Sequence, residues 1–233
     1  MTSRFQELTQ GATKLWLAQA VPNAQQCFGK ATSGQVMLGA KGRQAVHKVV
    51  VDGLHLVVRH YYRGGFPAHL TKDRYLFRGW QQTRAYLELN LLQDMLNNHL
   101  PVPRPIAAKA MKRGVFYTAD IATVEIERAQ TLAQRLFERK LEASVWSAIG
   151  KTIRDFHRLG FHHVDLNARN ILLDDAGKIY LIDFDRCVRR PYKKKWAQAG
   201  LARLHRSLIK ISRHEQAFHF YEQDFIGLLR AYG

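Results

Sequence analysis

The chain has 233 residues, 46% of them hydrophobic, which suffices for one large domain or two closely associated lobes and argues against disorder. It carries 36 Lys and Arg against 19 Asp and Glu, which gives a net charge of +17 at pH 7. Such a charge attracts nucleic acid, an anionic membrane surface or an acidic substrate. Composition alone does not choose among these, nor does it exclude a basic protein that has no such partner.

No apolar run approaches the ~18 residues of a membrane span, and residues 1–20 lack the apolar block of a signal peptide. We therefore expect a cytoplasmic protein. The two cysteines, Cys27 and Cys187, are too few and too far apart in sequence for a disulfide scaffold or a zinc site, so we expect reduced thiols.

Residues 1 to about 30 show no regular period and are expected to form an edge element or a lead-in segment. The run that follows contains Gly39, Lys41, Gly42 and Arg43 ahead of two apolar stretches. Glycines let backbone amides approach phosphate oxygens, and the two cations add charge, so we interpret this run as a phosphate-covering loop. A plain glycine turn between two strands is the alternative.

A strand is predicted over residues 54–62, where alternation places Val57, Arg59 and Tyr61 on one face. Arg59 ends an apolar strand, as the phosphate-binding Lys of kinases does. The change to Arg is not conservative, because a planar fork replaces a point charge. The alternative is an arginine on an edge strand with its charged group in solvent.

Helical spacing of the apolar residues predicts an amphipathic helix over residues 83–97. Glu88 lies on its inward face, where a carboxylate is costly unless it is paired. Arg59 is the partner we expect, in a strand-to-helix ion pair of the kind that positions phosphates in kinases. The alternatives place Glu88 at the solvent edge or against Arg84 one turn back.

Three prolines in residues 100–105 end this helix in extended chain. A strand pair around residues 115–119 and 121–126 is expected to complete a small sheet, with the backbone of residues 123–126 against an adenine ring. The lobe boundary then falls near residues 127–131. The prediction is an N-terminal lobe of residues 1–126 and a C-terminal lobe of residues 127–233.

A second helix is predicted over residues 143–159, with Gly160 as its stop. His157 on this helix and His162 after it are interpreted as packed, hydrogen-bonded residues rather than catalytic ones. The helix leads into the loop His163-Val164-Asp165-Leu166-Asn167-Ala168-Arg169-Asn170.

Asp165 and Asn170 stand at the spacing of a kinase catalytic loop. Two short apolar runs follow, separated by a glycine-containing turn, and predict a β-hairpin that returns Asp183 to the side of Asn170. Phosphoryl transfer requires a carboxylate to orient the acceptor hydroxyl and oxygen ligands for Mg²⁺. We therefore predict Asp165 as the catalytic residue, Asn170 and Asp183 as metal ligands, and ATP with Mg²⁺ as cofactors. The alternative is an ordinary turn capped by polar side chains.

Residues 186–195 are rich in Lys and Arg, and the apolar residues beyond them recur at helical intervals. Such a helix can lie on an anionic membrane, or it can pack its apolar stripe into a core and leave its cations outside. The second arrangement is favoured, and both hold if only the basic cluster of Arg189, Arg190 and residues 193–195 meets lipid headgroups.

The motifs together resemble those of the 3-deoxy-D-manno-octulosonic acid (Kdo) kinases, which belong with the lipopolysaccharide kinases of Gram-negative bacteria. The residues that carry the resemblance, over about residues 39–190, are Lys41-Gly42-Arg43, Arg59-His60-Tyr61-Tyr62-Arg63-Gly64-Gly65, Lys72-Asp73-Arg74-Tyr75, residues 100–108, residues 165–172 and Asp183-Phe184-Asp185. Val164 and Asp185 depart from the general kinase pattern, in which Arg and Gly stand at these positions. In protein kinases that are activated by phosphorylation of a loop, the Arg binds that phosphate. Its replacement by Val164 therefore favours a kinase of small molecules or sugars.

The resemblance implies a two-lobed protein-kinase-like α+β fold and ATP-dependent phosphorylation of the 4-hydroxyl of Kdo on a lipid A precursor. It also implies a peripheral location at the cytoplasmic face of the bacterial inner membrane, where anionic lipid accounts for the charge. Arg63, Lys72 and Arg74 are predicted contacts to the anionic acceptor. The rivals are a lipopolysaccharide heptose kinase, an atypical protein kinase, a kinase-like scaffold without activity, and a basic nucleic-acid-binding module. We expect no specific nucleic acid as a partner, because no recognition motif is present.

Overall fold

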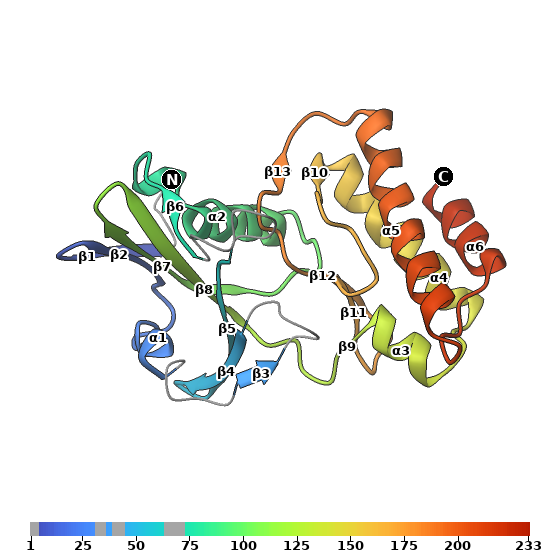
Figure 1. Ribbon diagram of the computed structural model, residues 1–233, viewed down its shortest axis with the longest axis horizontal. Helices are drawn as coiled ribbons and strands as arrows, with labels where there is room; N and C mark the ends of the chain where they lie inside the picture. Colours follow the sequence, from blue (N-terminus) through green and yellow to red (C-terminus); the bar gives the residue numbers. More distant parts are fainter. Residues whose placement is uncertain (1–4, 31–35, 39–44, 63–72) are drawn as a thin grey trace. The chain divides into compact units, whose positions relative to one another are not determined.

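The computed structural model describes residues 5–30, 36–38, 45–62 and 73–233 (Figure 1). The chain divides into two compact units, Met1–Gln93 with Arg104–Glu125, and Asp94–Pro103 with Ile126–Gly233. The first unit is built on an antiparallel sheet and the second is mostly helical. The fold is therefore α+β, and the predicted fold class is confirmed. Gly39, Lys41 and Gly42 of the predicted phosphate-covering loop lie outside the described residues. So do Arg63 and Lys72, two of the predicted contacts to the acceptor.

The first unit contains an eight-stranded sheet in the order β1-β2-β7-β8-β5-β4-β3, with β6 paired to β8. The strands are β1 (Phe5–Gln10), β2 (Thr13–Ala18), β3 (Val36–Leu38), β4 (Ala45–Val51), β5 (Leu54–His60), β6 (Tyr75–Leu76), β7 (Pro105–Arg113) and β8 (Phe116–Val124). The expected edge element at the N-terminus is the β1–β2 hairpin. Between β4 and β5, Asp52 and Gly53 have φ angles of 50° and 74°, the left-handed pair that a tight type I′ hairpin requires.

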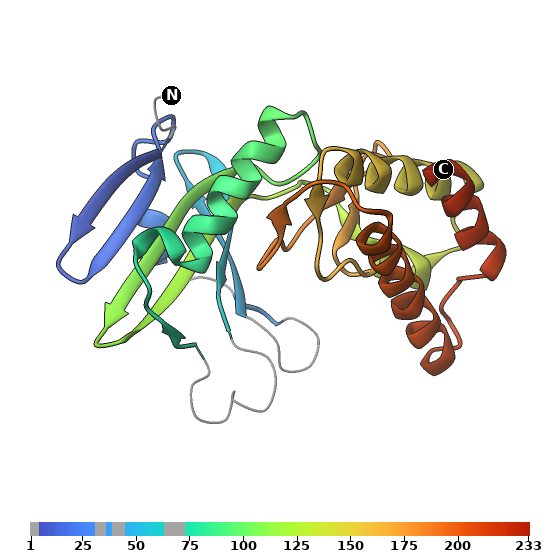
Figure 2. The same cartoon turned by 90° about the horizontal axis from the view of Figure 1, so that it is seen from above.

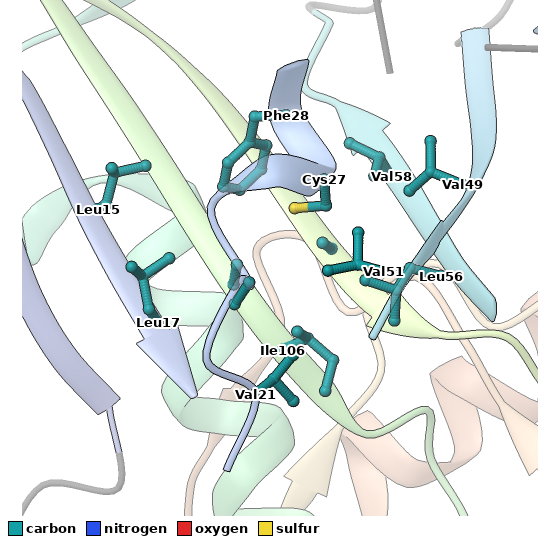
Figure 3. Close-up of a cluster of buried hydrophobic side chains, with 13 residues drawn as sticks. Leu15, Leu17, Val21, Cys27, Phe28, Val49, Val51, Leu56, Val58 and Ile106 are labelled. Carbon is teal, nitrogen blue, oxygen red and sulfur yellow. The ribbon is translucent and has the colours of Figure 1, made fainter. Parts of the chain in front are cut away.

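One face of this sheet is covered by the short helix α1 (Gln26–Lys30), whose Cys27 and Phe28 are buried in a hydrophobic cluster (Figure 3). Leu56 and Val58 of β5 point into the same cluster. Because side chains alternate along a strand, the residues between and beyond them face the opposite side. Burial raises the pKa of the Cys27 thiol to about 12, so this cysteine is an apolar core residue.

The opposite face of the sheet carries α2 (Arg84–Asn97), preceded by the 3₁₀ turn Trp80–Gln82 (Figure 2). Trp16 of β2 contacts Tyr86 of α2, with ring centroids 5.0 Å apart. The helix predicted over residues 83–97 is confirmed. Its position on this face brings it against the side of β5 that carries Arg59 and Tyr61.

The prediction of two paired strands at residues 115–119 and 121–126 is wrong. Residues 116–124 form the single strand β8, whose hairpin partner is β7, joined to it through Gly114 at a φ of 61°. Asp120 does not break β8, because its carboxylate accepts hydrogen bonds from His60 and Lys109 on the two neighbouring strands. The alanines of β7 lack the β-branched side chains typical of strands, but their small size suits a strand covered on both faces.

The second unit combines four helices with short strands. They are β9 (Gln130–Thr131), α3 (Leu132–Glu138), α4 (Ala143–Arg158), β10 (Phe161–His162), β11 (Ile171–Leu173), β12 (Ile179–Leu181), β13 (Val188–Arg189), α5 (Lys194–His214) and α6 (Glu222–Tyr232). Helices α4 and α6 approach closely at Gly150, where an added Cβ would lie 2.3 Å from the carbonyl oxygen of Leu228. Gly160, at a φ of 82°, ends α4 as predicted.

Helix α5 buries its apolar stripe in this unit and leaves its lysines and arginines exposed, so the favoured packing prediction is confirmed. The buried residues of the stripe are Trp196, Ala197, Gly200, Leu201, Leu204 and Leu208. Over the ranges that the structure describes, no helix is both long enough and apolar enough to cross a bilayer.

His157 is a packed residue, as expected: it is buried, its Nδ1 lies 2.9 Å from the Tyr232 hydroxyl, and its ring meets Trp196 edge-on. Burial, with smaller contributions from His162 and His163, lowers the pKa of His157 to about 4. The unfolded chain, whose histidine pKa is near 6.5, therefore binds this proton first as the pH falls.

We expect the free energy of unfolding to decrease between about pH 6.5 and pH 4, with ~3 kcal/mol of that decrease due to His157. Urea unfolding of the wild type and of His157→Phe at several pH values checks this. The variant should show a shallower decrease over that window. Parallel curves for the two proteins would contradict the assignment.

Candidate active site

A buried histidine in the candidate catalytic loop forms a hydrogen bond to the residue that follows β12. The Nε2–H group of His163 donates to the carbonyl of Ile182 at 2.9 Å, and the backbone N–H of Asp165 donates to Nδ1 at 3.2 Å. A carbonyl can only accept, so Nε2 carries a proton. Nδ1 accepts a hydrogen bond and therefore carries none, so the ring is neutral. Burial lowers the pKa of His163 and favours this neutral form. The ring therefore fixes the position of Asp165 relative to the chain that leads into Asp183.

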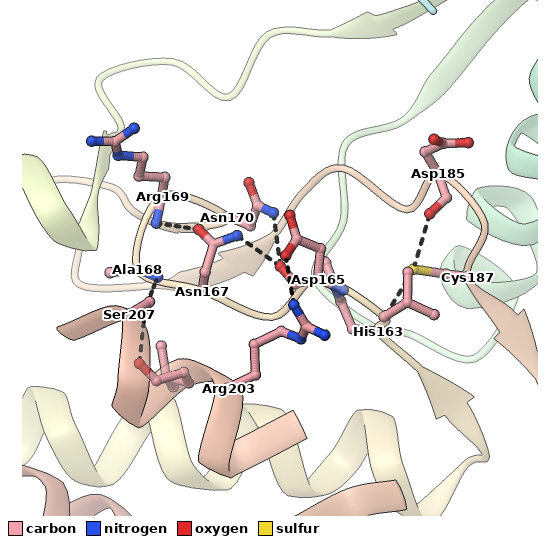
Figure 4. Close-up of polar contacts among 12 residues, drawn as sticks. His163, Asp165, Asn167, Ala168, Arg169, Asn170, Asp185, Cys187, Arg203 and Ser207 are labelled. Atoms are coloured by element: carbon pink, nitrogen blue, oxygen red, sulfur yellow. Dashed lines mark hydrogen bonds and ion pairs between the residues drawn. The ribbon is translucent and has the colours of Figure 1, made fainter. Parts of the chain in front are cut away.

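Two amide side chains fix the backbone of the loop (Figure 4). Asn167 and Asn170 each donate from Nδ2 to the carbonyl of Asp165 at 2.9 Å, and Oδ1 of Asn167 accepts from the backbone N–H of Arg169. Ala168 donates its N–H to the hydroxyl of Ser207 on α5. The loop thus holds the backbone of Asp165 in place and leaves its carboxylate exposed.

The hairpin of β11 and β12 returns the chain to this loop, as predicted. The N–H of Ile182 donates to the carbonyl of Asn170 at 3.0 Å, which places Asp183 beside Asn170. Asp183 adopts a φ of 63°, a conformation that costs free energy in residues other than glycine and that recurs at functional sites. Phe184 anchors the turn by packing between Phe156 and the His163 ring.

Nδ2 of Asn170 is committed to the loop backbone, so its amide oxygen is the atom left to bind a cation. With the carboxylate of Asp183 this gives two hard oxygen donors, the type that Mg²⁺ prefers. No group of three or more His, Cys, Asp or Glu side chains placed to hold a metal occurs among the residues that the structure describes. Such a group is not needed, because Mg²⁺ in kinases is completed by phosphate oxygens and water. The donor set fits Mg²⁺.

In the first unit, the predicted pairing of Arg59 with Glu88 is confirmed. Arg59 Nη2 forms an ion pair with Glu88 Oε1, and Tyr61 donates its hydroxyl to Oε2 at 2.6 Å. Only 4% of the Glu88 side chain is exposed. Arg59 lies on β5, between β8 and β4, so the interpretation as an edge arginine is wrong. The role of the pair in positioning phosphates stays a prediction.

Replacing Glu88 with Gln is expected to lower the free energy of unfolding by about 3 kcal/mol, because it removes the carboxylate that faces a largely buried guanidinium. The double change Arg59→Met with Glu88→Gln removes both charges and keeps an acceptor for Tyr61, so it should recover much of that loss. Urea unfolding and titration with Mg²⁺-ATP separate the two roles. Recovered stability with weakened nucleotide binding is expected, whereas wild-type binding by the double variant would show that the pair serves only the fold.

Two backbone amides in the segment expected to lie against adenine are already engaged. Val124 donates to the carbonyl of Arg104 at 2.8 Å, and Glu125 donates to that of His55 at 2.9 Å. The predicted hydrogen bonds to adenine are therefore limited to the other backbone groups of residues 123–126. Arg74, a predicted contact to the acceptor, is exposed.

The sheet-rich unit, the helical unit and the loop motif define a protein of the protein-kinase-like class. The chain matches the model of the lipopolysaccharide kinase (Kdo/WaaP) family over residues 29–232, and it therefore belongs to that family.

Several relatives bear the name 3-deoxy-D-manno-octulosonic acid kinase. One from Xylella fastidiosa (strain M23) is 45% identical, over 82% of this chain and 76% of the relative. One from Vibrio parahaemolyticus is 40% identical, over 86% and 83% of the two chains. One from Photobacterium profundum is 36% identical over 98% of both chains. The predicted family is confirmed.

Proposed function

We propose that this chain is a kinase that transfers the γ-phosphoryl group of ATP to the 4-hydroxyl of a Kdo residue on a lipid A precursor, in lipopolysaccharide core biosynthesis. Membership of the lipopolysaccharide kinase family and relatives named as Kdo kinases support the reaction and the acceptor. The single structural observation that carries the proposal is the convergence of Asp165, Asn170 and Asp183 through the hydrogen bonds around His163.

Each residue has a distinct role in this proposal. Asp165 accepts the proton of the acceptor hydroxyl and orients its oxygen for attack. Asn170 and Asp183 hold Mg²⁺, which when bound neutralises charge on the phosphate oxygens. Arg59, held by Glu88, and the loop of Gly39, Lys41 and Gly42 position and cover the phosphates.

The acceptor and its surroundings account for the net charge of +17. A lipid A precursor carries a sugar carboxylate and phosphates, and the cytoplasmic leaflet of the inner membrane is anionic. Arg190 and residues 193–195 are exposed beside the start of α5. Each cation near such a surface contributes about 1 kcal/mol, so we propose a peripheral association with the inner membrane.

Transfer of labelled γ-phosphate from ATP in the presence of Mg²⁺ tests the function. The acceptors are a Kdo-bearing lipid A precursor, the same lipid without Kdo, a heptose-bearing core and a purified protein substrate. Label on the Kdo-bearing lipid alone is expected. Label on the heptose core or the protein instead would move the activity to a sibling kinase, and binding of nucleic acid that persists in moderate salt would favour the non-enzymatic alternative.

A further inference from the structure

Arg203 extends from α5 toward the proposed catalytic carboxylate. Its Nη1 atom lies 3.5 Å from Oδ1 of Asp165 (Figure 4). Helix α5 is fixed against the same loop, because the Ser207 hydroxyl accepts the N–H of Ala168 at 3.1 Å and donates to the carbonyl of Leu204 at 2.8 Å. The base of the Arg203 side chain is therefore held in place relative to Asp165.

The Arg203–Asp165 contact is weak and easily exchanged. The two side chains are 50% and 54% exposed, and a single contact at 3.5 Å between solvated groups adds little to stability. The Arg203 guanidinium can therefore turn from Asp165 to another carboxylate with only a small loss of interaction free energy.

A second arginine lies in the same region as Arg203. Burial is the largest cause that lowers the pKa of His162, and the charges of Arg190, His163 and Arg203 lower it further. The two arginines come from different segments, the chain after β13 and helix α5. An anionic group next to the acceptor hydroxyl would therefore enter a favourable field.

We propose that Arg203 is a specificity-determining residue that binds the carboxylate of the acceptor sugar while Asp165 binds the hydroxyl to be phosphorylated. This inference rests on the proposed function. In an ulosonic acid the carboxylate is attached to C2, two ring bonds from C4, so a sugar with its 4-hydroxyl at Asp165 carries its carboxylate into the neighbourhood of Arg203. The phosphates of lipid A are on other sugars. The planar guanidinium can take a carboxylate through two parallel hydrogen bonds.

The experiment measures kcat/KM for three acceptors: the Kdo-bearing lipid A precursor, the same compound with its Kdo carboxylate converted to the methyl ester, and the same compound with its lipid phosphates removed. The enzymes are the wild type, Arg203→Gln, Arg203→Lys and Arg206→Gln. Arg206 is exposed on the next turn of α5 and gives a matched loss of charge.

We expect the wild type to prefer the free carboxylate over the ester by about tenfold to a hundredfold, as for a hydrogen bond to a charged group. Arg203→Gln should lose a similar factor on the free acid and on the dephosphorylated acid, with no loss on the ester. Arg203→Lys should keep part of the preference. Arg206→Gln should behave as the wild type, and KM for ATP should stay constant throughout.

A preference for the free acid that survives in Arg203→Gln would overturn the inference, as would equal losses in Arg203→Gln and Arg206→Gln. A loss seen only when the lipid phosphates are present would assign Arg203 to those phosphates instead. In each of these cases the wild type still phosphorylates the Kdo acceptor. Failure of the wild type to phosphorylate the unmodified acceptor would instead refute the proposed function.

Discussion

Replacing Asp165 with Asn is expected to lower kcat by about 10²- to 10⁴-fold, the range for loss of an acid–base residue. The change keeps the shape of the side chain and removes its ability to take the proton of the acceptor hydroxyl. The Asp165 side chain is exposed and the carbonyl of the same residue, not the carboxylate, accepts the bonds from Asn167 and Asn170. The loop should therefore keep its conformation.

The matched control for this variant is Asp155→Asn, an equal change of charge on the exposed side of α4. Steady-state kinetics with saturating ATP, alongside thermal unfolding of each protein, make the comparison. Near-normal turnover by Asp165→Asn would contradict the assigned role. So would a fall in activity of the same size in Asp155→Asn.

Replacing Asp183 with Asn should abolish the Mg²⁺ dependence of nucleotide binding and reduce activity to near background. Asn is the informative choice because the φ of 63° at this position is tolerated by Asn and Asp, whereas Ala would add backbone strain. Removing the negative charge takes away the stronger of the two proposed ligands.

Titration of ATP at several Mg²⁺ concentrations, by calorimetry, measures this effect directly and does not require turnover. The wild type should bind ATP more tightly as Mg²⁺ rises, and the variant should not. Identical Mg²⁺ dependence in the two proteins would remove Asp183 from the metal site. Unfolding curves check that the second unit stays folded.

The parts of the site that are local in sequence were predictable. Asp165 and Asn170 share one loop, and the turn after Leu173 returns the chain, so spacing alone places Asp183 beside them. The Arg59–Glu88 pair was also predictable, because strand alternation and helix periodicity each turn one charged residue inward, and a buried charge requires a partner.

Elements that depend on tertiary packing were missed or misread. Strand β7 has several alanines in place of β-branched residues. It is stabilised because both of its faces are covered by other parts of the protein. Helix α3 was missed although Thr131 and Gln134 form a capping box, a signal that the sequence does contain. Helix α6 was also missed, although Glu222 and Asp224 in its first turn are typical of a helix N-terminus. Its close packing against α4 at Gly150 is the part that depends on tertiary structure.

The roles of two residues at the catalytic loop could not be predicted from the sequence. His163 stands at the start of the loop motif, but its bond to Ile182 joins residues 19 positions apart and depends on the returning hairpin. Arg203 is on a helix well downstream of Asp165, and helical periodicity marks it only as an exposed cation. The packing of α5 against the loop is what brings Arg203 to the site.

The most direct test of the account is to locate the phosphate in the product. The wild type is incubated with Mg²⁺-ATP and a Kdo-bearing lipid A precursor, with Asp165→Asn in parallel, and the product is examined by phosphorus–proton correlation NMR. The account predicts a new phosphorus signal coupled to the proton on C4 of Kdo, made by the wild type and nearly absent with Asp165→Asn. A phosphate on another sugar, or the same yield from both enzymes, would contradict it.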